Sequence, residues 1–249
     1  MMIAPLSLMQ ILTVASTALV TSTITSLIGA GGGTVLLLVM LYVLPAPSVI
    51  PIHGCIQIIS NSTRVYLFWR HMHWPIIFRF ITLMPIGVYL GLQLYHLLEP
   101  HMIKLVIAIA ILVSLFMRMP RAAGEAKFPP ALYYPLGLFI GFGNMIVGVL
   151  SPVLAAVLRL EALSKEQTVA TLGFFGFMGN ILKIAGFSAV GFAFVHYLPL
   201  IVPACVASII GGYAGKFLLQ RSSNQFFQQA FKGMIAVLAL KMIWDVFSG

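Results

Sequence analysis

Acidic residues are scarce in this chain: five Asp and Glu occur among 249 residues. Charged residues of both signs make up 8% of the sequence, against about 25% in a typical soluble domain. A surface with so little charge cannot keep a chain of this size in water, so a water-soluble fold is excluded.

Cysteine is also rare, and this excludes a disulfide scaffold. Cys55 and Cys205 are the only two, and both lie inside apolar runs, where packed thiols are expected. There is no Gly-X-Y period and no low-complexity tract, which excludes collagen and disorder.

Apolar residues make up 61% of the chain and form runs of the kind that membrane helices need, about 20 residues each. The first run has no basic segment before it and further runs follow at once, so we interpret it as a membrane helix and not as a signal peptide. The runs cover residues 8–28, 34–44, 49–69, 75–97, 102–116, 132–142, 145–158, 164–187, 192–217 and 226–247.

Two of these runs, 34–44 and 132–142, are too short to cross a bilayer alone, and each lies beside a glycine-rich segment. Residues 29–33 read Gly-Ala-Gly-Gly-Gly, and residues 141–144 read Gly-Phe-Gly-Asn, with Gly148 close behind. Glycine costs about 1 kcal/mol per residue in a helix interior, and non-helical backbone at membrane depth must face protein or water. We therefore expect broken, half-length or re-entrant helices at both segments. A close helix contact through glycine is the alternative.

The two groups of runs resemble each other at a constant spacing. An offset of 119 residues pairs Gly29 with Gly148, Gly54 with Gly173, Asn61 with Asn180, and Arg64 with Lys183. The polar pairs carry most of the signal, because such residues are rare inside apolar runs. The spacing predicts a first membrane repeat at 1–118, a polar cytoplasmic linker at 119–130 and a second repeat at 131–249.

The basic gaps of the two repeats lie at non-equivalent places. In the first repeat Arg70 and Arg79 follow the third run, whereas the second repeat has its basic residues at 159–165 and 216–221. Under the positive-inside rule, repeats of opposite charge polarity must have opposite orientations. Five elements per repeat satisfy this requirement and put both termini outside the cytoplasm. We therefore predict an all-α polytopic membrane protein of two inverted-topology repeats.

A polar stripe follows one face of the run 49–69 and recurs, less polar, in the second repeat. Lipid would leave its groups without hydrogen-bond partners, so the stripe must face protein or water. The second repeat keeps Asn180 and Lys183 on the equivalent face. The members of the first stripe, at helical spacing, are His53, Gln57, Asn61 and Arg64.

Arg64 and Lys183 lie within the hydrocarbon region, where a cation costs about 2.5–3.5 kcal/mol and is a candidate for function. Snorkelling to the interface is the alternative. No acidic residue lies in either stripe, so an anionic substrate would supply the missing charge, and a helix beginning near Gly33 would add N–H donors. Whether the two cations share one pocket stays open. The predicted substrate-binding residues are Gly31, Gly32, Gly33, Thr34, His53, Gln57, Asn61, Arg64, Ser151, Asn180 and Lys183.

Other chemistry finds little support in the sequence. There are no paired carboxylates, no His-Glu-x-x-His pattern and no nucleophile with a base at fixed spacing, so an enzyme is not expected. No metal or cofactor is expected, because His71 and His73 lack Cys or carboxylate partners. His53 could carry a coupling proton, although a hydrogen-bonded pore histidine is the plainer interpretation. The basic residues lie in gaps between apolar runs, so nucleic acid is not an expected partner.

The glycine segment 29–33 after an N-terminal apolar run, the polar membrane helix around His53 and the basic gap after it resemble the TauE/SafE sulfite and organosulfonate exporter family. The resemblance covers nearly the whole chain. It implies export of small sulfur-containing anions such as sulfite or sulfoacetate from the bacterial cytoplasm. The segment 148–152 departs from the fuller glycine-rich motif that members often have in the second half.

The expected function is therefore that of an inner-membrane transporter, embedded in the lipid bilayer, which exports a small anion by alternating access. A gated small-anion channel is the alternative within transport, and a membrane assembly factor is the alternative outside it. The coupling ion and the oligomeric state, a homodimer included, stay open.

Overall fold

The computed structural model describes residues 6–28, 31–116, 128–158, 160–161, 163–219, 240 and 244. Within these residues the chain forms nine α-helices, three short 3-10 helices and no strand, which confirms the predicted all-α class. The predictions for Gly29, for residues 119–127 of the linker, for the basic residues Arg159 and Arg221 and for most of the last run lie outside the described residues.

Four of the described helices are long and apolar enough to cross a membrane, as expected for a multi-pass membrane protein. Two further helices are apolar but shorter, at Gly32–Val43 and Pro100–Val113. The four long segments are Leu8–Ser26, Trp74–Tyr95, Glu166–Ala189 and Phe194–Leu218.

The first two helices, α1 (Leu8–Ile28) and α2 (Gly32–Val43), fold back on each other. Gln10 Nε2, near the start of α1, donates a hydrogen bond of 2.7 Å to the carbonyl of Val43, which ends α2. The chain turns at Gly31, whose φ of 102° lies in the region that favours glycine. The glycine segment therefore brings the chain back to the end of the bundle at which it started.

The next three helices run alternately up and down the bundle. They are α3 (Ala46–Phe68), α4 (Trp74–Tyr95) and α5 (Pro100–Phe116). Tyr95 Oη donates to the Pro47 carbonyl at 3.0 Å, which fixes the end of α4 beside the start of α3.

The second half of the chain contains α6 (Tyr133–Ile146), α7 (Ser151–Leu158), α8 (Lys165–Ala189) and α9 (Leu198–Leu219). Ser164 caps α8: its hydroxyl accepts from the backbone N–H of residue 167, and the side chain of that residue returns to the Ser164 N–H. Such a reciprocal cap satisfies two backbone donors at the start of the helix.

The break in the second half lies later than the sequence predicts. Residues 141–144 are helical and belong to α6; the chain leaves the helix after Ile146 and turns at Gly148, whose φ is 83°. Gly141 serves packing instead, because a Cβ there would meet the Met84 carbonyl of α4. The break predicted at 141–144, with Gly148 close behind, therefore falls at Gly148 and not at 141–144, and the alternative, a close helix contact, holds for Gly141.

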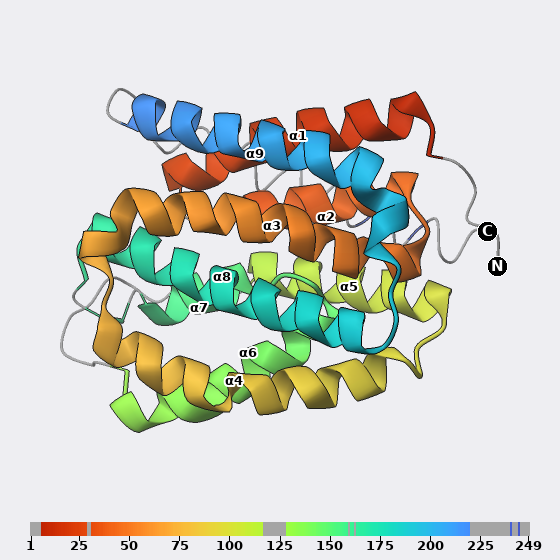
Figure 1. Ribbon diagram of the computed structural model, residues 1–249. Helices are drawn as coiled ribbons and strands as arrows, with labels where there is room; N and C mark the ends of the chain where they lie inside the picture. Colours follow the sequence, from red (N-terminus) through yellow and green to blue (C-terminus); the bar gives the residue numbers. More distant parts are fainter. Residues whose placement is uncertain are drawn as a thin grey trace.

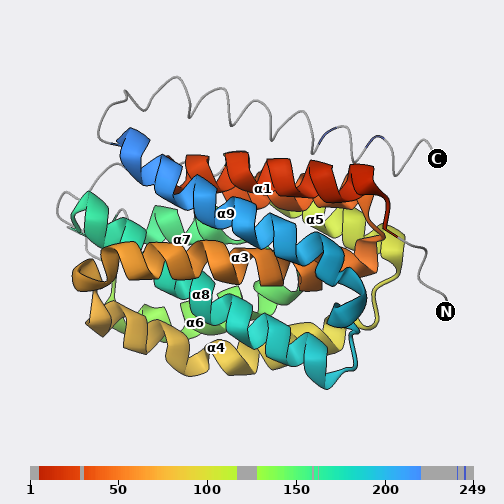
Figure 2. The ribbon, with the colours of Figure 1, turned by 45° about the horizontal axis from the view of Figure 1, so that its top comes forward.

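The helices form three layers, and their axes are roughly aligned, with the chain running in both directions (Figures 1 and 2). α1 and α9 lie side by side in one outer layer, α4 and α6 lie in the other, and α3 and α8 pack on each other between them. Both outer pairs are parallel. Gly211 and Gly215 of α9 face the carbonyls of Leu19 and Thr23 of α1, and α4 and α6 meet through glycines in the same way.

Charge gathers at one end of the bundle, which we call the basic end: the turn 69–73, the start of α6, the turn between α7 and α8, and the end of α9. Two hydrogen bonds hold it together. His73 N donates to Thr171 Oγ1 at 3.3 Å, and Tyr133 Oη donates to Glu161 Oε1 at 2.9 Å. The basic residues described towards this end are Arg70, Arg79 and Lys216, with Lys165 at the first position of α8.

The half of the bundle at the opposite end is filled by apolar side chains. This opposite end comprises the start of α1 and the turns that join α2 to α3, α4 to α5 and α8 to α9. One buried cluster connects α2, α3, α5 and α9 there. Its fully buried members include Leu36, Leu38, Ile50, Ile52, Ile107 and Leu200.

Gly137→Ala should destabilise the contact between α4 and α6. The new Cβ would meet the Phe80 carbonyl, and backbone cannot move aside cheaply. We expect a loss of about 1–3 kcal/mol, as for other overpacked sites, seen as a lower melting temperature in detergent. Gly186→Ala is the matched control, because its Cβ would make ordinary contacts, the nearest at 3.4 Å. Equal melting temperatures for the two variants would contradict this account of the packing.

Candidate functional site

α3 and α8 are antiparallel and meet through reciprocal contacts at the centre of the bundle. A Cβ at Gly54 of α3 would lie 3.0 Å from Lys183 Cδ of α8, and a Cβ at Gly173 of α8 would lie 3.3 Å from Arg64 Cβ of α3. These are the residue pairs that recur at the spacing of 119. Arg64 of the first half therefore packs on Gly173 of the second half, and Lys183 of the second half packs on Gly54 of the first.

Each cation is also bound to an asparagine three residues before it on the same helix. Arg64 Nη2 donates to Asn61 Oδ1, and Lys183 Nζ donates to Asn180 Oδ1 at 3.3 Å. Lys183 makes a second bond, of 2.9 Å, to the carbonyl of Gly148. Lys183 is 0% exposed and Arg64 6%. Lys183 thus ties α8 to the turn between α6 and α7.

The first turn of α2 presents backbone donors towards α3. The N–H of Thr34 bonds to the Gly31 carbonyl at 3.0 Å, so the N–H groups before it have no acceptor within their own helix. The Gly33 carbonyl accepts a bond of 2.9 Å from His53 Nε2, and a Cβ at Gly33 would lie 3.2 Å from Gln57 Nε2. The polar stripe of α3 therefore faces the glycine segment.

In the second half α7 begins at an equivalent place. Its first helical residue, Ser151, follows Leu150, whose carbonyl accepts from Val153 N at 3.1 Å. The start of α2 and the start of α7 line one cavity, the former through Gly31 and Gly33. Two helix N-termini, each with a partial positive charge, thus converge on the same space. The free donors of the first turns differ in number: α2 offers the N–H groups of Gly32 and Gly33, whereas α7 offers that of Ser151, because Pro152 has no N–H.

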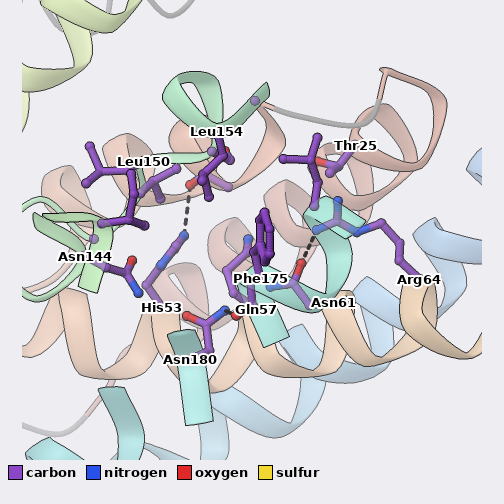
Figure 3. Close-up of a pocket in the computed structure, with 18 of the residues that line it drawn as sticks. Thr25, His53, Gln57, Asn61, Arg64, Asn144, Leu150, Leu154, Phe175 and Asn180 are labelled. Atoms are coloured by element: carbon purple, nitrogen blue, oxygen red, sulfur yellow. Dashed lines mark hydrogen bonds between the residues drawn. The ribbon is translucent and has the colours of Figure 1, made fainter. Parts of the chain in front are cut away.

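The cavity lies between α3, α8 and the two glycine turns (Figure 3). No Asp or Glu belongs to its lining, so its donors suit an anion. The polar lining consists of Thr25, His53, Gln57, Asn61, Arg64, Asn144, Ser151 and Asn180, with Gly31, Gly33, Gly148 and Gly176 between them. The apolar lining consists of Met84, Ile140, Val149, Leu150, Leu154, Leu172 and Phe175.

The cavity extends from the centre of the bundle towards the basic end. Apart from His53, the lining residues of α3, which extend to Arg64, and those of α8, from Leu172 to Asn180, lie on the basic side of the Gly54–Lys183 contact. Apolar clusters flank the cavity on both sides: the cluster described above in the opposite half, and a second cluster with Met84, Ile140 and Phe175 in the basic half. In this conformation the cavity therefore lies mainly between the Gly54–Lys183 contact and the basic end.

Five pairs of lining residues are 119 positions apart in the sequence. Equivalent positions of the two halves therefore meet at one cavity, as expected at the interface between two repeats. Arg64 is an exception, because its equivalent, Lys183, lies behind the wall and does not line the cavity. The five pairs are Thr25 with Asn144, Gly31 with Leu150, His53 with Leu172, Gln57 with Gly176, and Asn61 with Asn180.

Most of the predicted binding residues meet at this cavity, and three do not. Gly32 packs on α1, Thr34 is buried in α2, and Lys183 lies behind the wall. Sequence reasoning missed Thr25 and Asn144, although the spacing of 119 would have found both as a pair. The predicted residues that line the cavity are Gly31, Gly33, His53, Gln57, Asn61, Arg64, Ser151 and Asn180.

Comparison with known proteins bears on this cavity. A family model described as Sulfite exporter TauE/SafE matches residues 14–242, a segment that contains every lining residue. Neither a curated protein nor a solved structure matches the chain.

Gly31→Ala should disturb the first glycine turn. With φ at 102°, alanine would carry backbone strain of about 1–2 kcal/mol, which should lower the melting temperature. Gly33→Ala is the matched control in the same segment, because its Cβ would meet only the end of the Gln57 side chain, at 3.2 Å. A larger loss for Gly33→Ala than for Gly31→Ala would refute the assignment of the turn to Gly31.

Proposed function

The chain belongs to the sulfite exporter TauE/SafE family, and on that premise we propose that it exports a small anion from the bacterial cytoplasm by alternating access. The candidate substrates are sulfite, sulfoacetate and related organosulfonates. The cavity carries the proposal. It brings a guanidinium and two helix N-termini to one space whose lining contains no carboxylate.

The anion would bind by hydrogen bonds to its oxygens. Arg64 supplies the net positive charge of the lining, and guanidinium donors match the geometry of oxyanions. The side-chain amides of Asn61 and Asn180 line the cavity. The first turn of α2 adds the backbone N–H of Gly33 as a donor. Bonds to a charged group contribute about 1.5–3 kcal/mol each, so a few of them compensate for part of the lost hydration.

We further propose that residues 1–118 and 131–249 are inverted repeats related by an axis through the cavity. The reciprocal contacts of α3 with α8 support this relation. The outer layers also support it. When the two halves are exchanged, α1 takes the place of α6 and α9 takes the place of α4, so the pair α1 and α9 becomes the pair α6 and α4. Such repeats, with a site at their interface, are typical of secondary transporters.

The basic end would face the cytoplasm, because cytoplasmic segments carry the excess of Lys and Arg. The start of α1 lies at the opposite end, which would place it in the periplasm, and five elements per repeat would place the C-terminus there as well. In an inner membrane that is negative inside, the potential favours anion exit by about 2.3 kcal/mol per charge per 100 mV. Export would therefore need no coupling ion.

Two alternatives make different predictions. A gated anion channel would conduct without saturation, whereas a carrier shows saturable flux. A membrane assembly factor would move neither sulfite nor sulfoacetate. The cavity, lined by equivalent residues of both halves, favours transport over assembly.

Arg64→Gln should abolish most of the flux. In liposomes with an imposed potential, we expect labelled sulfite to move saturably through the unmodified protein. Loss of one charged hydrogen bond, about 1.5–3 kcal/mol, should slow this flux by about 10- to 100-fold at subsaturating sulfite. Arg70→Gln is the matched control, because Arg70 is exposed at the basic end, against Trp69. Equal flux in the two variants would remove Arg64 from the path.

Sulfite should also stabilise the protein in detergent. At a concentration 100 times the dissociation constant, binding to the folded state adds about 2.7 kcal/mol, which raises the melting temperature. Arg64→Gln should lose this shift, whereas Arg70→Gln should keep it. A shift of equal size with chloride at the same ionic strength would show a salt effect and not a site.

A further inference from the structure

The two equivalent cations have different environments. Arg64 lines the cavity, whereas Lys183 is buried behind its wall, with Nζ bound to the Gly148 carbonyl and to Asn180 Oδ1. Their helices, their asparagine neighbours and their contacts with glycine are otherwise equivalent. Unequal environments at equivalent positions are what one state of a two-state protein shows.

The same asymmetry distinguishes the two halves of the bundle. Met84, Ile140 and Leu154 are among the seven apolar lining residues, and their equivalents do not belong to the lining. Two of the pairs are 119 positions apart, and the third is 124 apart, the spacing that relates Gly87 of α4 to Gly211 of α9. The buried equivalents are Thr21 for Ile140, Val35 for Leu154 and Ser208 for Met84.

Ser208 is a second feature that the conformation described above leaves unexplained. Its side chain is 0% exposed, and its Oγ has no hydrogen-bond partner among the described residues. A buried hydroxyl without a partner is unfavourable. A conformation with a cavity on this side would place the hydroxyl against water, as Met84 now lines the cavity on the basic side.

We propose that the protein has a second conformation, open to the opposite end, in which Lys183 releases Gly148 and lines the cavity while Arg64 withdraws into the wall. In the conformation described above, Lys183 is the latch that keeps the opposite half closed. In the second conformation it receives the anion from Arg64. The inference rests on the proposed function and deepens it, since it assigns one cation to each access state.

Asn180 connects the anion to the latch. It lines the cavity, and its Oδ1 is one of the two acceptors that hold Lys183. Its Nδ2 donates to the Gly176 carbonyl at 2.7 Å. An anion that draws this amide towards itself weakens the bond to Lys183, and the freed ammonium gains the anion in exchange for two neutral oxygens. The substrate can therefore favour the second state by its differential interaction with Lys183.

Cysteine accessibility in the full-length protein tests this role. In a background of Cys55→Ser and Cys205→Ser, Met84→Cys reports the basic half and Ser208→Cys reports the opposite half. A membrane-impermeant maleimide is added from one side of oriented vesicles at a time. Without added anion we expect Met84→Cys to react from the basic side and Ser208→Cys to be protected.

Lys183→Met should release the latch. We expect labelling of Ser208→Cys from the opposite side to rise by about tenfold, equivalent to about 1.4 kcal/mol, while labelling of Met84→Cys falls. Lys183→Arg keeps the charge and the donors and should restore the protection. Asn180→Ala, which removes one acceptor, is the second route and should raise labelling in the same direction. It also covers the case in which Lys183→Met does not fold, as judged by size-exclusion chromatography.

Two results would overturn the proposal. Ser208→Cys could stay protected in every folded variant, or both positions could react at once from their own sides, as in a continuous pore. Labelling needs no transport, so the two proposals fail separately. Sulfite flux without reciprocal labelling removes the latch alone, and reciprocal labelling without sulfite flux removes the proposed substrate alone.

Discussion

The packing of α3 on α8 is the contact on which the rest of the structure depends. The side chain of Arg64 packs against Gly173, and that of Lys183 packs against Gly54. A shift of either helix by one turn would place the long Lys183 side chain against a residue larger than glycine. This register brings Asn61 and Asn180, Gln57 and Gly176, to one cavity. The outer pairs, α1 with α9 and α4 with α6, then cover the two sides of this central pair (Figure 1).

The same contact places two cations where charge is unfavourable. Lys183 Nζ donates to two neutral oxygens, from Gly148 and Asn180, which accept from two of its three N–H groups and do not neutralise its charge. Arg64 binds Asn61 and faces the cavity. Positive potential from both residues and from two helix N-termini is thus concentrated in one region of low dielectric constant, where electrostatic attraction of an anion is strong.

Glycine has two separate uses in this fold. Gly31 and Gly148 adopt positive φ at the turns that open the cavity, where an L side chain would be strained. Gly137, Gly141, Gly211 and Gly215 are helical and let neighbouring backbones approach. The sequence shows both kinds as glycine clusters, so a pattern of glycine alone cannot distinguish a turn from a contact, and the break assigned to 141–144 was an error of this kind.

The sequence by itself determined the helical class, the membrane setting and the polar face of α3, and it showed that Gly, Asn and a cation recur at a spacing of 119, because hydropathy, periodicity and scarce polar residues are local properties of the chain. Only the tertiary structure decided that Thr25 and Asn144 join the cavity, that Lys183 stands behind its wall, and that the second turn falls at Gly148. These facts depend on which helices touch and at what register. Arg64 and Lys183 each follow an asparagine by three residues and bind it, yet the packing of the bundle gives them different environments.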